Sequence, residues 1–121
     1  MDTGMENKAR IIQELVPGKQ ISLAHIIASP DPVLYEKLGL DPAVDYSQSA
    51  IGVLTVSPAE TAIILADVST KASHVTLGFV DRFAGTLIIT GTVSSVEASF
   101  EAVLDYAGNK LGFALCPLTR T

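Results

Sequence analysis

Cysteine, tryptophan and positive charge are all scarce in this chain. Its 121 residues include one cysteine, Cys116, and no tryptophan. A single thiol cannot form an internal disulfide and offers no cysteine pair for a metal site, which fits a reducing compartment. Eight Lys and Arg stand against 13 Asp and Glu, for a net charge of −5. Because the cations are scattered, the basic cluster that binds nucleic acid is missing, and we predict no nucleic-acid partner.

Long hydrophobic runs are also missing. No run approaches the roughly 18 to 20 apolar residues of a membrane-spanning helix, and Met1 to Glu6 lack the basic-then-apolar pattern of a signal sequence. We therefore expect no membrane partner and a cytoplasmic location. Yet 48% of the residues are hydrophobic and only 17% are charged, which is high for one small domain. This balance predicts that some apolar surface meets other subunits.

Residues that carry chemistry are equally few. The chain has no paired carboxylates, no nucleophile with a base beside it and no phosphate-binding loop. Neither His25 nor His74 has Asp, Glu or Cys at metal-ligand spacing, so both are interpreted as partly buried, hydrogen-bonded side chains. Cys116 is interpreted as a small hydrophobic residue. We predict no metal, no cofactor and no catalytic residue.

The stretch from Ala50 to Thr121 reads as two strand–helix–strand units. Helix starts are expected at Ser57-Pro58-Ala59-Glu60 and at Ser94-Ser95-Val96-Glu97, where a serine caps the helix and a glutamate reaches back. Residues 75–80 and 86–90 are predicted strands, joined by the turn 81–85. Gly112 is expected to end the second helix in a left-handed conformation. This order predicts an α+β, two-layer, ferredoxin-like fold with both helices on one face of an antiparallel sheet.

The first part of the chain adds two strands and a short helix. Residues 1–8 read as a tail, 9–16 as a strand, 19–28 as a second strand, and Ser29 to Gly39 as a capped short helix before a polar loop over 41–49. The strand at 9–16 follows no partner in the chain, and a lone strand is unstable in water. Copies from neighbouring subunits could close into a small parallel barrel without free edges.

One face of that leading strand must point into such a barrel. Ile11, Gln13 and Leu15 share one face, and Glu14 lies on the other. Several copies of Glu14 in a narrow lumen would repel one another. We therefore predict that Ile11, Gln13 and Leu15 line the barrel lumen.

Several segments together resemble a known family. They are Lys71-Ala72-Ser73-His74-Val75, the turn through Gly85, Ile88 to Gly91, the helix from Val93 to Leu111, and the shorter pieces IIQE, VPGKQ, LAH, GFVDRF and LTRT. The chain resembles the circularly permuted shell proteins of the ethanolamine and propanediol microcompartments. In ordinary members of that family, the piece that matches Leu23 to Pro30 comes last instead of first.

The resemblance implies a structural protein and not an enzyme. Six subunits would form a hexameric tile that packs edge to edge in the shell of a bacterial microcompartment in the cytoplasm. Residues 1–18 would form the tail and a six-stranded parallel barrel over the pore, and residues 19–121 one permuted shell domain. The implied partners are further copies of the chain, other shell proteins, and encapsulated enzymes or a docking protein at the barrel.

The resemblance also implies two site regions. Lys71 and His74 fall at the tile edge, with His74 standing where many relatives have Asn. Asp81, Arg82, Phe83, Ala84 and Gly85 fall toward the sixfold axis. Within this turn, an ion pair between Asp81 and Arg82 is the default expectation, and Phe83 is expected to pack against another group.

Two other functions remain open from the residues alone. An acylphosphatase-like hydrolase on a similar fold would need an anion-binding loop and a positioned arginine, for which the chain offers only Ser57-Pro58 and Arg82. A regulatory module could bind a small ligand at a subunit interface. A native mass measurement separates a six-subunit tile from both alternatives.

Overall fold

A five-stranded mixed sheet forms the centre of the molecule. The computed structural model describes residues 18–121. The strands are β1 (Gln20–Ile27), β2 (Ala50–Ser57), β3 (Thr76–Asp81), β4 (Thr86–Gly91) and β5 (Thr119–Arg120), in the spatial order β3-β4-β2-β1-β5. All neighbours are antiparallel except β1 and β5, which are parallel. The four strands expected between residues 19 and 90 are therefore confirmed, and where both ends were predicted they differ from the observed bounds by one residue or less.

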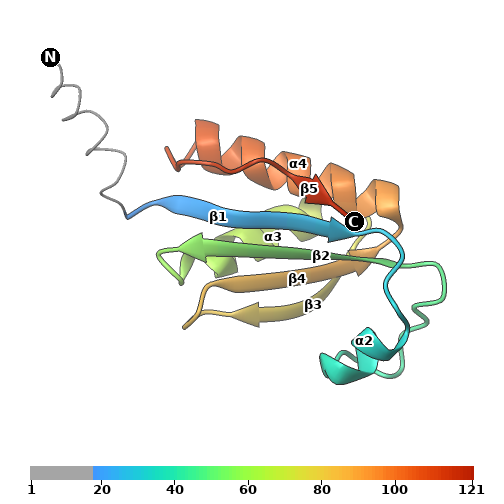
Figure 1. Cartoon of the computed structure of the whole chain (residues 1–121). Coiled ribbons are helices and arrows are strands. Elements are labelled where there is room, and N and C mark those ends of the chain that lie inside the picture. The colour runs from blue at the N-terminus through green and yellow to red at the C-terminus, as the bar shows by residue number, and fades with distance from the viewer. Residues whose placement is uncertain (1–17) are drawn as a thin grey trace, which may run out of the picture.

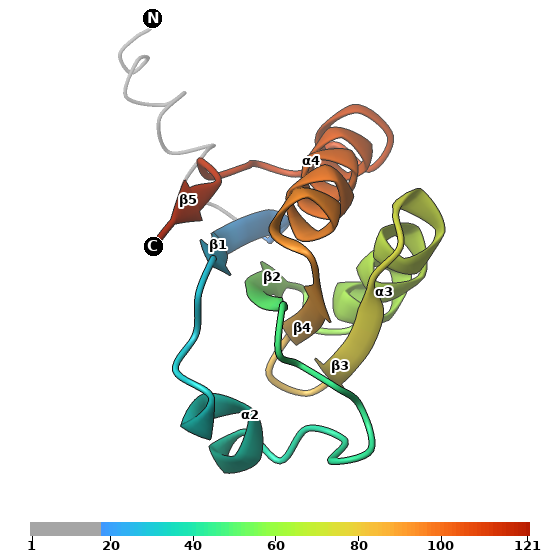
Figure 2. The ribbon, with the colours of Figure 1, turned by 90° about the vertical axis from the view of Figure 1, so that its right-hand side faces the viewer.

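The helices form a layer on one face of this sheet. They are α3 (Thr61–Ala72) and α4 (Val93–Asn109), which pack side by side, while the short α2 (Val33–Lys37) lies on the opposite side (Figure 1; Figure 2). The predicted α+β, two-layer fold is confirmed. The tail, the barrel strand and the lumen residues Ile11, Gln13 and Leu15 lie outside the described residues.

Apolar side chains between the sheet and the two helices form the main core. Alternate residues of β2 and β4 point into it, as period-two strands require. In β1 the core residues are Ile21, Ala24 and Ile26, because the pairing with β2 shifts register between Ile21 and Leu23. On the helix side, Phe100 is the largest fully buried side chain of the layer. The core consists of Ile21, Ala24, Ile26, Ala50, Leu54, Val56, Ala62, Leu65, Ala66, Leu87, Ile89, Val96, Phe100, Val103 and Ala107.

Both helix starts differ from the sequence prediction. Ser57 is the last residue of β2, and its peptide bond to Pro58 is cis. Helix α3 begins four residues after Ser57, with Glu60 at its N-cap position and no side-chain cap. At α4 the cap is Thr92, whose Oγ1 accepts a hydrogen bond from the Ser95 N–H at 3.1 Å. The predicted serine cap fails there because Thr92 still has extended backbone and so reaches the free N–H groups first.

Glycines with positive φ end two helices near the expected positions. Gly39 has φ +71° just after α2, and Gly112 has φ +72° three residues after α4 ends. Only glycine adopts this region without steric cost. The stop predicted at Gly112 is thus confirmed as a left-handed residue, after a short irregular turn that begins at Lys110.

A second, smaller apolar cluster covers part of the other sheet face. Tyr35 and Leu40, from the excursion between β1 and β2, pack on Ile51 and Ile88. The rings of Tyr35 and Tyr46 stack with centroids 4.3 Å apart. The excursion thereby covers part of the sheet face that lies opposite α3 and α4 (Figure 2).

Candidate functional site

Strand pairing places the two candidate regions at opposite ends of the sheet. Asp81 pairs with Thr86, and Thr86 with Thr55, close to the start of β1. We call this the turn end. Lys71 lies in the last turn of α3, which starts near the turn end and runs toward the start of β3. We call the end of the sheet near Lys71 the lysine end. The six residues of β3 separate the two ends by about 20 Å.

Lys71 is highly exposed at the lysine end. Its Nζ lies 2.9 Å from Oδ2 of Asp67, one helical turn earlier, and the two side chains are 75% and 60% exposed. His74 is exposed too, so the expectation of a partly buried, hydrogen-bonded histidine is wrong there. The reason lies in the backbone, because Ser73 is extended and leads the chain away from the helix layer. The structure therefore brings both predicted edge residues to the same exposed end.

The turn from Asp81 to Gly85 is organised by its own backbone. Oδ1 of Asp81 accepts hydrogen bonds from the N–H groups of Phe83 at 2.8 Å and Ala84 at 3.0 Å. The hydrogen bond from Ala84, followed by that from Phe83, holds the pKa of Asp81 below its ordinary value, because both favour the charged carboxylate. The expected ion pair with Arg82 is wrong, because the carboxylate is engaged by the backbone and the guanidinium lies 4.9 Å from the centre of the Phe83 ring.

The other turn residues leave an aromatic ring in solvent. Phe83 is 83% exposed, and its only described stacking contact is with Arg82. Gly85 has φ +80°, and its carbonyl accepts a hydrogen bond from the Val56 N–H at 2.9 Å. A Cβ at Gly85 would overlap the Val56 carbonyl oxygen, so glycine is required. The turn is thus fixed at its base and exposes Arg82 and Phe83 at its tip.

Hydrogen bonds that the sequence did not predict join the C-terminal residues to β1. His25 is partly buried, and its Nδ1 and Nε2 lie 2.6 Å and 2.8 Å from the hydroxyls of Thr119 and Thr121. The interpretation of His25 as a hydrogen-bonded histidine is therefore confirmed. The signal was weak in the sequence, because its partners are more than 90 residues away.

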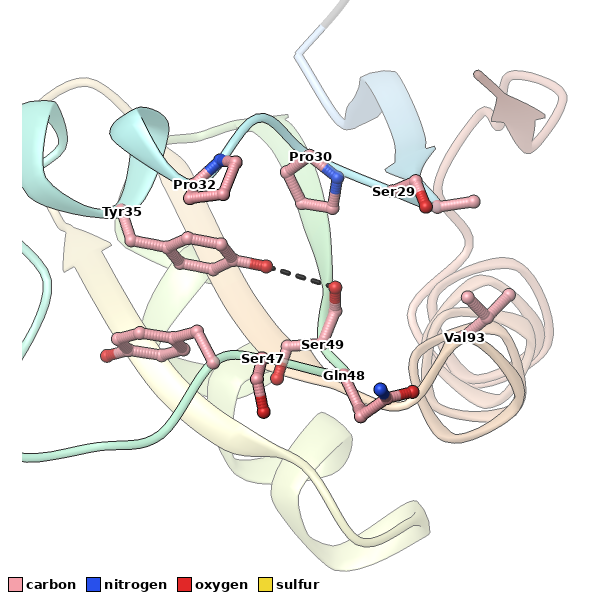
Figure 3. Close-up of a pocket in the computed structure, with 10 residues that line it drawn as sticks. Ser29, Pro30, Pro32, Tyr35, Ser47, Gln48, Ser49 and Val93 are labelled. Carbon is pink, nitrogen blue, oxygen red and sulfur yellow. Dashed lines mark hydrogen bonds between the residues drawn. The ribbon is translucent and has the colours of Figure 1, made fainter.

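A groove of about 750 Å³ opens at the lysine end (Figure 3). Within it, the Tyr35 hydroxyl donates to the Ser49 carbonyl at 3.0 Å, which fixes the ring beside Pro32. None of the side chains along the groove is charged. They are Ala28, Ser29, Pro30, Pro32, Tyr35, Tyr46, Ser47, Gln48, Ser49 and Val93.

The exposed candidate residues thus lie at the two ends of one sheet, with an uncharged groove at the lysine end. Residues 50–118 match the BMC domain, and the chain belongs to this family of bacterial microcompartment proteins. No helix among residues 18–121 has both the length and the apolar character needed to cross a membrane.

Named relatives cover almost the whole chain. The microcompartment shell protein CutR of Streptococcus intermedius is 51% identical over 93% of this chain and 92% of its own. PduU of Salmonella typhimurium is 49% identical over 93% of both chains, and EutS of the same species is 48% identical over 95% of this chain and 99% of its own. All three are named shell proteins, so the hydrolase alternative finds no support.

A solved structure agrees with the fold. A solved flat hexamer of CutR superposes with a TM-score of 0.79 at 48% identity, covering 88% of this chain and 94% of that one. A second CutR structure, a screw, gives a TM-score of 0.78 at the same identity. The same relative therefore assembles in more than one way.

Proposed function

We propose that this chain is a non-catalytic shell protein whose homohexamer forms a flat tile in the wall of a bacterial microcompartment in the cytoplasm. The likeness to shell proteins over nearly the whole chain carries this proposal, together with the flat hexamer of CutR. Tiles would meet edge to edge with further copies or with other shell proteins.

The two ends of the sheet supply a layout for such a ring. In the proposed tile, the turn end faces the sixfold axis, and the lysine end faces outward to the next tile. The first described residues, Gly18 and Lys19, lie at the turn end, since Gln20 pairs with Ser57 at the end of β2. Residues 1–17 are therefore joined to the domain at the end proposed for the axis. This supports a barrel over the pore, with Ile11, Gln13 and Leu15 in its lumen.

Apolar side chains along one flank favour contact between subunits in the ring. Strand β3 is the outer strand of the sheet and has an open edge. Leu77 on this strand and Ile63 on α3 are 44% and 51% exposed, and both line a groove of about 500 Å³ between the two elements. Exposed apolar residues that gather in this way mark an interface. We assign this flank to the neighbouring subunit.

The outer surface of the proposed barrel is the docking point for an encapsulated enzyme or another protein. In this arrangement residues 1–18 form the tail and barrel, and residues 19–121 form the shell domain. Glu14, on the outer face, would give the barrel a ring of negative charge. A lumen lined by Ile11 and Leu15 closes the pore to polar molecules.

Replacement of Lys71 tests the edge assignment. Lys71→Ala is expected to leave the hexamer intact in native mass measurements and to reduce two-dimensional arrays in electron micrographs, because an exposed side chain contributes little to the folded subunit. Lys37→Ala is the matched control, since Lys37 is exposed on α2 in a different part of the surface. Arrays that form equally well in both variants would rule out Lys71 as an edge contact, and a monomer or dimer of the unaltered chain would rule out the tile.

A further inference from the structure

Lys71 has a partner within its own helix. The 2.9 Å ion pair with Asp67 joins residues four apart on α3, so the long lysine side chain lies back along the helix surface. The hydroxyl of Thr70, on the same helix, is engaged elsewhere. Its Oγ1 donates to the backbone carbonyls of Ala66 and Asp67, both at 3.2 Å.

We propose that Asp67 is a positioning residue for contact between tiles, an inference that rests on the edge role proposed for Lys71. An ammonium group has three N–H donors. Oδ2 of Asp67 accepts one, which leaves two for carbonyl oxygens of a neighbouring tile. Because Asp67 already restricts the lysine rotamers, less side-chain freedom is lost when the contact forms.

A small effect at each lysine multiplies across a sheet of tiles. A surface ion pair at this spacing changes the population of the ordered side chain about twofold. A sixfold tile that joins a growing sheet forms about three new edges. Each edge has one lysine from either tile, so roughly six lysines gain a contact. Loss of all these ion pairs is therefore expected to raise the protein concentration at which sheets form by a factor on the order of tens.

The test compares four proteins and one control at low salt. Asp67→Asn, Lys71→Ala, the double variant and the unaltered chain are titrated for the concentration at which sheets appear by light scattering and electron microscopy. Asp67 also lines the groove between α3 and β3 that we assign to the neighbouring subunit of the ring. Native mass and the unfolding midpoint therefore report the ring and the fold of each variant, and loss of the ring in Asp67→Asn would contradict the positioning role. The control is Glu101→Gln, which removes one negative charge from an exposed position on α4.

The expected result is an intact ring with an unchanged unfolding midpoint and a sheet-forming concentration roughly tenfold or more higher for Asp67→Asn. Glu101→Gln should leave that concentration unchanged, and Asp67→Asn should add nothing once Lys71 is alanine. If Lys71→Ala disrupts sheets but Asp67→Asn does not, or if Asp67→Asn acts equally with and without Lys71, the positioning role is wrong while the edge role stands. If Lys71→Ala itself changes nothing, both fail.

Discussion

Gly52 sets how closely α4 can pack on the sheet. It lies in β2 directly under the helix, and an added Cβ would lie 2.8 Å from Val96 Cγ1 and 2.9 Å from two ring carbons of Phe100. Val96 and Phe100 are both 0% exposed, so neither has room to turn away. Gly52→Ala must therefore push the helix outward or force both side chains from their rotamers.

The expected cost follows from the size of this overlap. Ordinary carbon contacts begin at about 3.5 Å, so the added methyl group demands a shift of roughly half an ångström or more in a close-packed layer. Overpacking of this kind destabilises proteins by about 1 to 3 kcal/mol. For a domain of this size, that predicts a drop in melting temperature of about 5 to 15 °C.

Gly108 provides a matched control with a different expected sign. Its added Cβ would lie 2.9 Å from Leu115 Cδ1, but Leu115 is 48% exposed and can rotate into solvent. Gly108 also lies within α4, where alanine is favoured over glycine by about 0.5 to 1 kcal/mol. Gly108→Ala should therefore be neutral or stabilising.

Urea unfolding of the two variants measures the difference. Both must be compared with the unaltered chain at one protein concentration, because assembly adds to apparent stability. Gly52→Ala should lower the midpoint and Gly108→Ala should not. A Gly52→Ala protein as stable as the unaltered chain would refute the claim that the α4 layer is rigid, and equal losses in both would show that mobility at Leu115 does not matter.

Two more substitutions test the turn end. Gly85→Ala should lower the free energy of unfolding by at least about 2 kcal/mol, because alanine is strained at positive φ and its Cβ overlaps the Val56 carbonyl. An unchanged urea midpoint would contradict this. Asp81 has a lowered pKa, so its charge stabilises the fold above its ordinary pKa of 3.8, and this contribution is lost as pH falls through the lower folded value. The free energy of unfolding should therefore fall less steeply below about pH 4 in Asp81→Asn than in the unaltered chain. If it falls equally in both proteins as the pH is lowered, the two backbone hydrogen bonds do not stabilise the charged Asp81.

Periodicity in the sequence was enough to predict the main elements. Strands at β1 to β4 follow from runs of β-branched and aliphatic residues, and α4 follows from its continuous apolar stripe. The same local rules misplaced both helix caps. At Ser57 the pattern of a capping box was present, but Ser57 is the last residue of β2 and pairs with Gln20 of β1. Pairing with β1 thus overrode a local preference.

The candidate site could be predicted in part. Exposure of Lys71 and a turn at residues 81–85 agree with the sequence interpretation, whereas the partners of their side chains do not follow from it. Asp81 was expected to bind its charged neighbour, but backbone N–H groups two and three residues ahead are held closer by the turn. His74 was expected to be partly buried, but the extended backbone at Ser73 leaves it exposed.

The sequence by itself determined what is local in this protein: where strands and helices form, which faces are apolar, and the absence of grouped catalytic or basic residues. These follow from spacing along the chain, which needs no knowledge of what packs against it. Tertiary structure alone decided that Lys71 and the Asp81 turn lie at opposite ends of one sheet, and that Thr119 and Thr121 bind His25 across the length of the chain. Such relations depend on strand order and register, which are fixed only when distant segments bury their apolar faces together.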